Sequence, residues 1–202
     1  MTGRLLLCAL AAMAITGCRE SPDAAVGMST PAPDAALPKY FPLPEFSLIE
    51  RSGQPLHLAD LAGKVWVADF FYTTCPGPCP MLSSRLSDVQ TALGEAPDVR
   101  LLSISVDPEK DTPEVLKQYA QKFQATARWL FATGDKAHIY DLARRGFKLP
   151  LAEPATDGEM ITHSTRLVLV DRTGTVRGFY EGGAEASVGE LVRDIGKLLA
   201  EK

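Results

Sequence analysis

A nearly unbroken apolar segment, residues 65–72, runs directly into a loop that contains two cysteines, Cys75 and Cys79. An apolar run of this length predicts a buried strand. Apolar residues at helical spacing then predict a helix that ends near Gly94: Leu82, Leu86, Val89 and Leu93. The cysteines therefore lie between the end of a buried strand and the start of a helix. In α/β proteins this junction exposes reactive groups, because the strand ends there and the first helical N–H groups are free.

The spacing of the two cysteines allows more than one chemistry. A separation of four positions can place both sulfurs on one side of a helical turn. The pair could then close a disulfide or bind one soft metal ion. A purely structural disulfide would add little stability, because closing so short a loop removes little chain entropy. A redox pair and a metal site are the two functional hypotheses that remain.

The first 17 residues predict a secretory signal, with Arg4 followed by an apolar run over residues 5–15. This run is shorter than the roughly 20 residues of a membrane-spanning helix. It ends in the sequence Ile-Thr-Gly-Cys, which resembles the lipobox of bacterial lipoproteins, so we expect cleavage before Cys18 and a lipid on that cysteine. An ordinary signal peptide that is cleaved elsewhere is the alternative. Cleavage at Cys18 leaves Cys75 and Cys79 as the only free thiols of the mature protein.

Residues 18–39 predict a flexible tether, because they are rich in Ala, Pro, Asp and Ser and lack apolar periodicity. We therefore expect an exported lipoprotein of the bacterial cell envelope, attached to a membrane by its lipid, with residues 40–202 as one periplasmic domain. In such an oxidising compartment a close thiol pair becomes oxidised unless a reductant or a metal protects it. The net charge of -4 gives no sign of nucleic-acid binding.

The order of the expected elements is typical of a thioredoxin-like fold. This α/β fold has a central mixed sheet flanked by helices, here with an N-terminal strand extension. The last helix is expected to open with a capping box formed by Ser187 and Glu190. Asp111 is expected to be a turn or capping residue at the start of a helix near Pro113. The other expected elements are strands at residues 41–50, 99–106 and 129–132, a helix at 136–145, and a hairpin formed by 166–170 and 175–180.

Four stretches, taken together in their order along the chain, are more informative about the protein family than the cysteine loop alone. They are residues 70–80 with Cys-Pro-Gly-Pro-Cys-Pro, residues 105–113 with Ser-Val-Asp-Pro-Glu-Lys-Asp-Thr-Pro, residues 129–134, and the pair His163-Ser164. Together they resemble the Sco/SenC family, thioredoxin-like copper proteins that assist the assembly of cytochrome c oxidase. The likeness covers roughly residues 41–201. The stretch 150–162 departs from the family pattern. Because this loop often shapes the surface that meets the partner, the resemblance does not identify the particular partner.

The resemblance implies that Cys75, Cys79 and His163 bind copper, as Cu(I), Cu(II) or both, and that Asp107 is a functionally important acid beside the site. It implies a copper-receiving subunit of a terminal oxidase as one partner, and a periplasmic copper donor or thiol reductant as another. Two thiolates and an imidazole are a soft donor set that suits Cu(I). A helix N-terminus also favours the thiolate form of nearby cysteines. We therefore expect a metallochaperone for the copper centre of cytochrome c oxidase.

Thiol–disulfide exchange through Cys75 and Cys79 is the main alternative. Thioredoxin-type reductants usually have two residues between the cysteines, whereas this chain has three. The position of the proline that faces the thiols in those proteins falls near Thr165, and the chain has no proline between residues 155 and 170. His163 lies beside that position, which favours a metal site over a reductase.

Other chemistry-bearing residues give weaker signals. A peroxidase of the peroxiredoxin type would need a small hydroxyl residue three positions before Cys75, where this chain has Tyr72. His57 and His138 are expected to lie at the surface without a functional role.

Overall fold

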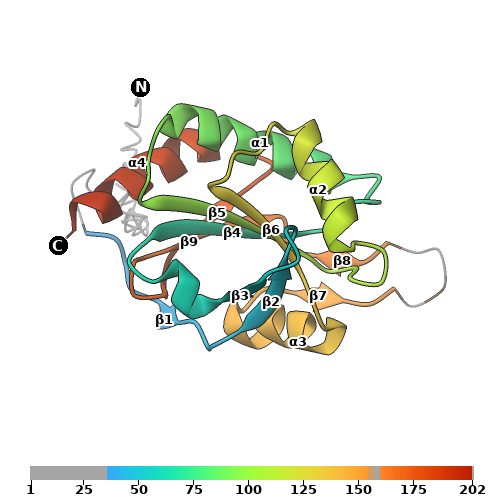
Figure 1. Ribbon diagram of the computed structural model, residues 1–202. Coiled ribbons are helices and arrows are strands. Elements are labelled where there is room, and N and C mark those ends of the chain that lie inside the picture. The colour runs from blue at the N-terminus through green and yellow to red at the C-terminus, as the bar shows by residue number, and fades with distance from the viewer. Residues whose placement is uncertain (1–35, 155, 157–159, 202) are drawn as a thin grey trace, which may run out of the picture. The chain divides into compact units, whose positions relative to one another are not determined.

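The computed structural model describes residues 36–154, 156 and 160–201 (Figure 1). These residues belong to one compact unit that begins at Ala36. The expected signal segment, the expected lipidation site Cys18 and most of the expected tether lie outside the described residues. Among the helices of the described part, none has the length and apolar character needed to cross a membrane.

An eight-stranded mixed sheet forms the centre of the unit, in the order β1-β10-β9-β4-β5-β6-β2-β3. β4 lies inside this order, parallel to β5 and antiparallel to β9. All seven residues of β4 are buried, which explains why Asp69 is the only charged residue in this apolar run. The strands are β1 Phe41–Pro42, β2 Ser47–Glu50, β3 Pro55–His57, β4 Val65–Phe71, β5 Val99–Ser105, β6 Trp129–Thr133, β9 Arg166–Val170 and β10 Thr175–Glu181.

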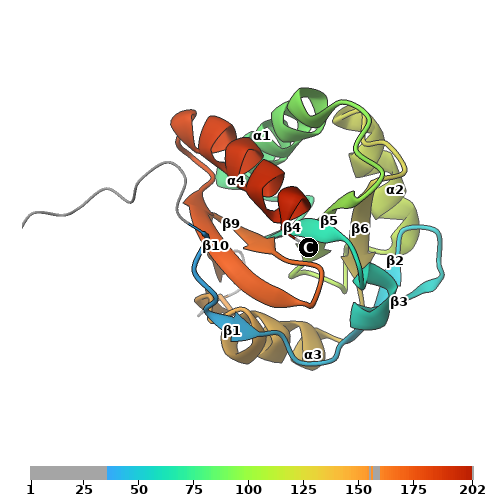
Figure 2. The same cartoon turned by 90° about the vertical axis from the view of Figure 1, so that its left-hand side faces the viewer.

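Helices cover both faces of this sheet (Figures 1 and 2). α1 (Pro78–Leu93), α2 (Pro113–Lys122) and α4 (Ala186–Ala200) lie on one face, where the Phe71 ring of β4 packs 5.1 Å from Tyr119 of α2. α3 (Lys136–Asp141) lies on the other face and continues into a π-helical turn, η2 (Leu142–Gly146). On that side Trp66 and Phe70 pack edge-on against Phe147. The predicted mixed sheet between helices is confirmed.

The expected single strand over residues 41–50 is wrong, because this segment forms two strands at distant positions in the sheet. β1 pairs with β10, whereas β2 pairs with β6 and β3. Proline lacks the N–H that a strand ladder needs, so Pro42 and Pro44 interrupt the pairing. Between the strands the chain crosses the α3 side of the sheet, where the Phe46 ring lies 6.4 Å from Trp66.

Two helix starts also differ from the sequence prediction. Thr112, not Asp111, caps α2, and its side chain accepts a 3.4 Å hydrogen bond from the backbone N–H of Val115. α4 begins at Ala186 and has no side-chain cap bond. The capping box predicted for Ser187 and Glu190 is therefore wrong, since Ser187 already lies within the helix.

A buried arginine on β10 joins both ends of the described chain. Arg177 is only 2% exposed and forms ion pairs with Asp171 at 2.9 Å and with Glu201 at 2.8 Å. It also donates hydrogen bonds to the carbonyl groups of Leu37 and Pro38, both at 2.9 Å. Glu201 accepts through both of its carboxylate oxygens, so four residues supply five acceptor atoms and the guanidinium uses all five of its N–H groups.

Replacing this arginine should destabilise the fold strongly. In Arg177→Met the buried carboxylate of Asp171 loses its counter-charge, and such losses cost about 3–5 kcal/mol. We expect urea unfolding to show a decrease of that size in the free energy of unfolding. Arg145→Met is the control, because Arg145 forms an exposed ion pair with Asp141 and exposed pairs contribute about 1 kcal/mol or less. Equal effects of the two substitutions would contradict this account of Arg177.

Candidate metal centre

Cys75, Cys79 and His163 come together at the end of β4. One ligand atom from each residue lies within 4.8 Å of the other two, and no other group of this kind was found in the part of the chain that the structure describes. The Cys79 sulfur is 3.1 Å from Nε2 of His163. Both cysteines are free thiols and buried, with exposures of 6% for Cys75 and 0% for Cys79. The predicted ligand residues therefore form a compact, shielded set of two sulfurs and one imidazole nitrogen.

The two cysteines converge through a loop and not through a helical turn. We call residues 72–77 the metal loop; it connects β4 to α1, and Pro78 is the first residue of α1. Cys79 is thus in the first turn of the helix, whereas Cys75 precedes it. The backbone N–H of Cys75 donates to the carbonyl of Tyr72 at 3.3 Å, which turns the chain back towards the helix. Both sulfurs consequently lie near the free N–H groups at the start of α1.

His163 is held in place by a small hairpin that the sequence did not predict. The strands β7 (Leu151–Ala152) and β8 (Thr162–His163) form a separate two-stranded sheet in which Leu151 is opposite His163. Nδ1 of His163 is 3.0 Å from the carbonyl oxygen of Ser164. Because a carbonyl oxygen can only accept, Nδ1 carries the proton and Nε2 presents its lone pair towards Cys79. The Tyr72 ring packs edge-on against the imidazole at 5.7 Å.

The three groups differ in how readily each presents a free donor atom to a metal ion. Burial acts to raise the pKa of Cys75, but hydrogen bonds from the Cys79 thiol and from the backbone N–H groups of Cys79 and Gly77 outweigh it and lower the pKa. Burial, together with the neighbouring Cys75, raises the pKa of Cys79. Burial also lowers the pKa of His163, so the imidazole is neutral at physiological pH. Cys75 is therefore the more readily ionised thiol of the pair.

A pocket of about 560 Å³ adjoins the metal loop. The loop contributes Tyr72, Thr74 and Pro76 to its lining, which also includes Asp107 and Met160. Its other lining residues are Glu109, Lys110, Lys136, Tyr140, Glu153, Pro154, Thr156 and Ile161. The described residues of the stretch 150–162, in which we expected a departure from the family pattern, thus contribute both to the wall of this pocket and to the β7–β8 pair that carries His163.

The two aspartates of the turn after β5 have different surroundings. Asp107 forms a 3.0 Å ion pair with Lys110 and faces the pocket. Asp111, which we expected to be a simple turn or cap residue, is fully buried and accepts hydrogen bonds from Thr73 of the metal loop and from Ser105. That expectation was wrong, because the contact with Thr73 spans 38 positions in sequence.

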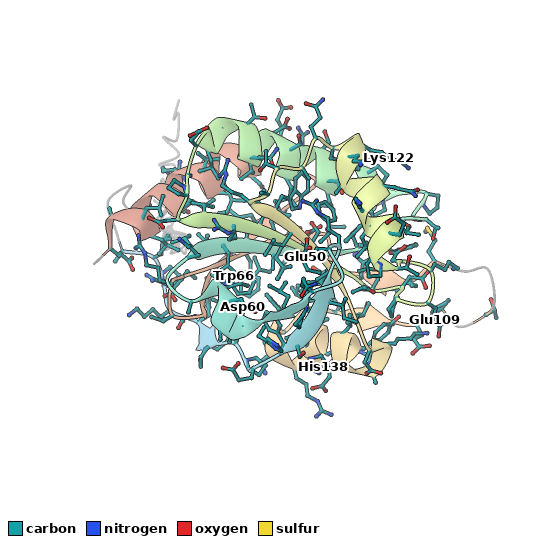
Figure 3. The ribbon with its side chains drawn as sticks, viewed as in Figure 1. Glu50, Asp60, Trp66, Glu109, Lys122 and His138 are labelled. Atoms are coloured by element: carbon teal, nitrogen blue, oxygen red, sulfur yellow. The ribbon has the colours of Figure 1, made fainter. Side chains whose placement is uncertain are left out.

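The remaining histidines lie outside the three-residue group. His57 is exposed at the end of β3. His138 lies on α3 (Figure 3), where its Nε2 accepts a 3.4 Å hydrogen bond from the backbone N–H of Ser47. Neither belongs to the cluster of potential metal ligands.

Asp69 lies in the middle of β4, and the sequence analysis did not identify it as a residue near the site. Its only signal in the sequence was a charged residue within an apolar run. Its side chain is fully buried, and neither carboxylate oxygen has a hydrogen-bond partner among the described residues. Burial raises its pKa from 3.8 to about 7. In the alternating pattern of a strand Asp69 shares a face with Phe71, which packs under α2. A negative charge on Asp69 also contributes to the raised pKa of Cys79.

The buried carboxyl should make stability depend on pH. Because the pKa is raised on folding from 3.8 to about 7, the folded state retains a proton that the unfolded state loses. Stability should therefore fall between pH 4 and pH 7, by up to about 4 kcal/mol at roughly 1.4 kcal/mol per pH unit. Asp69→Asn should remove this decrease and unfold at higher urea concentration than the wild type at pH 8, with little difference at pH 4.5. An equal pH dependence in both metal-free, reduced proteins would contradict the assignment.

The chain matches the SCO1/SenC family model over residues 37–200. It is 32% identical over 161 residues to the SCO1 protein homolog of Bacillus subtilis, and the matched region covers 78% of this chain and 83% of that relative. The protein therefore belongs to the SCO1/SenC family.

Solved structures of family members have the same fold. A SCO1/SenC family lipoprotein from Bacillus anthracis superposes with a TM-score of 0.74 at 34% identity, covering 80% of this chain and 96% of that one. BsSco, described as a Sco family cytochrome c oxidase assembly protein with a disulfide switch, also gives 0.74 at 30% identity, with coverage of 83% and 99%. Bradyrhizobium japonicum ScoI with copper bound gives 0.65 at 29% identity, with coverage of 75% and 98%. The predicted thioredoxin-like α/β fold is confirmed.

Proposed function

We propose that this protein binds one copper ion through Cys75, Cys79 and His163 and delivers it to the copper centre of cytochrome c oxidase during assembly. The observation that carries the proposal is the convergence of two thiols and one imidazole within 4.8 Å. This donor set accepts Cu(I) well and can also hold Cu(II). With only three protein ligands, the ion keeps one side free for a ligand from the receiving protein.

The family relationship supports both parts of this proposal. ScoI from Bradyrhizobium japonicum has been solved with copper bound, and BsSco is described as belonging to a family of cytochrome c oxidase assembly proteins. Each shares about 30% of its residues with this chain over most of the unit. The copper-receiving subunit of a terminal oxidase is accordingly the proposed partner.

The residues of the site have distinct tasks in binding and release. Cys75, whose pKa is lowered, offers a thiolate first, and copper binding then displaces the proton of Cys79. His163 enters as a neutral imidazole and needs no deprotonation at Nε2. Because protons compete with the metal for the thiols, affinity should weaken as the pH falls, which aids release in an acidic environment.

Thiol–disulfide exchange is the second candidate function, supported by the two adjacent free thiols and by the disulfide switch described for BsSco. Cys75 is the more exposed and more readily ionised thiol, so its thiolate would attack a target disulfide. Cys79 would then displace the target, which leaves a Cys75–Cys79 disulfide and two reduced target sulfurs. His163 has no required part in these steps.

We also propose that the protein is exported and held at a bacterial membrane by a lipid on Cys18. The lipobox-like sequence before Cys18 supports this, as does the description of the Bacillus anthracis neighbour as a lipoprotein. Cys18→Ser should release the protein from the membrane fraction into the soluble periplasmic fraction. Retention of this variant in membranes would contradict the lipid anchor.

Copper binding is tested by anaerobic titration of the reduced protein with Cu(I). We expect one tightly bound copper per chain in the wild type, and loss of tight binding in Cys75→Ser and in Cys79→Ser. In His163→Ala we expect the affinity to fall at least about 10-fold, because replacing a residue that only hydrogen-bonds to a metal ligand already lowers metal affinity by about that factor. His138→Ala is the control and should bind like the wild type. Wild-type affinity in all three site variants would exclude this ligand set.

His163 also separates the two candidate functions in cells. In a bacterial strain that lacks its own copy, the wild-type gene should restore cytochrome c oxidase activity, and the Cys75→Ser gene should not. Copper delivery predicts that His163→Ala fails as well, because an ion ligand is lost. If the His163→Ala gene restores full activity, thiol reduction is the main function and copper delivery is contradicted.

A further inference from the structure

A fully buried aspartate on the turn after β5 contacts the metal loop directly. Asp111 accepts a 3.0 Å hydrogen bond from the backbone N–H of Thr73 and a 2.5 Å bond from the Thr73 hydroxyl. The Ser105 hydroxyl donates to the same carboxylate at 2.5 Å. Thr73 precedes Cys75 by two residues, so these bonds act on the segment that carries the first thiol.

The same carboxylate belongs to a network that fixes the turn on which it lies. The backbone N–H of Asp111 donates to the carbonyl of Asp107 at 2.9 Å. The backbone N–H of Asp107 in turn donates to the Ser105 hydroxyl oxygen at 3.1 Å. The end of β5, the following turn and the metal loop are thus joined by bonds that meet at Asp111.

A carboxylate accepts all three of these bonds with charge assistance. Its three donors are one backbone N–H and two hydroxyls, and an ionised carboxylate only accepts. An asparagine could still accept from the Thr73 backbone N–H and the Ser105 hydroxyl through Oδ1, and its NH₂ group could donate to the Thr73 hydroxyl, which also accepts. It would replace charge-assisted bonds by weaker neutral ones, and so loosen the hold on the loop. The substitution is close to isosteric, so it tests the hydrogen bonds more than the packing.

We propose that Asp111 is the positioning residue that holds Cys75 in place for metal binding, and that Asp107 does not have this task. The proposal deepens the copper-binding function and rests on it. Asp107 pairs with Lys110, whose side chain is 66% exposed, and it faces the adjoining pocket. The acid of this turn that acts on the ligand geometry is therefore the second one, four positions after Asp107.

The test compares Asp111→Asn with Asp107→Asn in two assays. The first is the Cu(I) affinity of the reduced protein, and we expect a loss of about 10- to 100-fold in Asp111→Asn, as for other partners of metal ligands. The second is the rate at which Cys75 reacts with iodoacetamide in the metal-free protein, followed by peptide mass mapping. We expect this rate to change several-fold in Asp111→Asn, whereas Asp107→Asn should match the wild type in both assays.

Variants of Thr73 keep the proposal testable if Asp111→Asn does not fold. Thr73→Val removes the hydroxyl that donates to Asp111 and preserves the side-chain shape, so both assays should shift in the same direction as in Asp111→Asn. Thr73→Ser retains the hydroxyl and should restore wild-type values. A purely structural role for the contact would lower the unfolding temperature of Thr73→Val without changing either assay, and would overturn the proposal.

The outcomes separate this inference from the copper function. A wild-type protein without tight copper binding would contradict the proposed function, and the reaction rate of Cys75 would still decide the positioning role of Asp111. Tight wild-type binding with unchanged values in Asp111→Asn and Thr73→Val would overturn only the inference. A larger loss in Asp107→Asn than in Asp111→Asn would overturn it too.

Discussion

The parallel pairing of β4 with β5 is the constraint on which the site depends. The two strands run in register from Val65 opposite Val99 to Phe71 opposite Ser105. Their carboxyl ends therefore lie side by side, and the N–H of Val106 still donates to the carbonyl of Phe71 at 2.8 Å. The metal loop and the turn with Asp111 both leave the sheet at this edge, and so a cysteine loop and an aspartate distant in sequence meet.

The antiparallel neighbour of β4 brings the third ligand to the same edge. Because β9 runs in the opposite direction, with Val168 opposite Ala68, the residues just before β9 lie beside the end of β4. His163 precedes Arg166, the first residue of β9, by three positions and is aligned further by its pairing with Leu151. One parallel and one antiparallel ladder thus bring two thiols and an imidazole together, and the strand pairing alone is enough to assemble the site.

The sequence predicted the parts of this arrangement that depend on local pattern. The apolar run of β4 and the helical spacing of α1 located the cysteine junction, and the family resemblance identified His163 as the third ligand residue. The parts that depend on long-range pairing were not predictable: the separation of β1 from β2, the β7–β8 hairpin and the contact of Asp111 with Thr73. Asp107 and Asp111 have similar local surroundings in sequence, so only the fold distinguishes them. Asp69 had only one local signal, its position within the apolar run of β4, and the absence of a hydrogen-bond partner for its carboxylate was visible only in the fold.

X-ray absorption at the copper edge of the reduced, Cu(I)-loaded protein tests the central claim most directly, because it reports the atoms bound to the ion. The account predicts two sulfur ligands and one imidazole nitrogen per copper, with the nitrogen signal lost in His163→Ala. A spectrum with two sulfurs and no imidazole, or with nitrogen and oxygen ligands alone, would contradict the assignment of Cys75, Cys79 and His163 as one copper site.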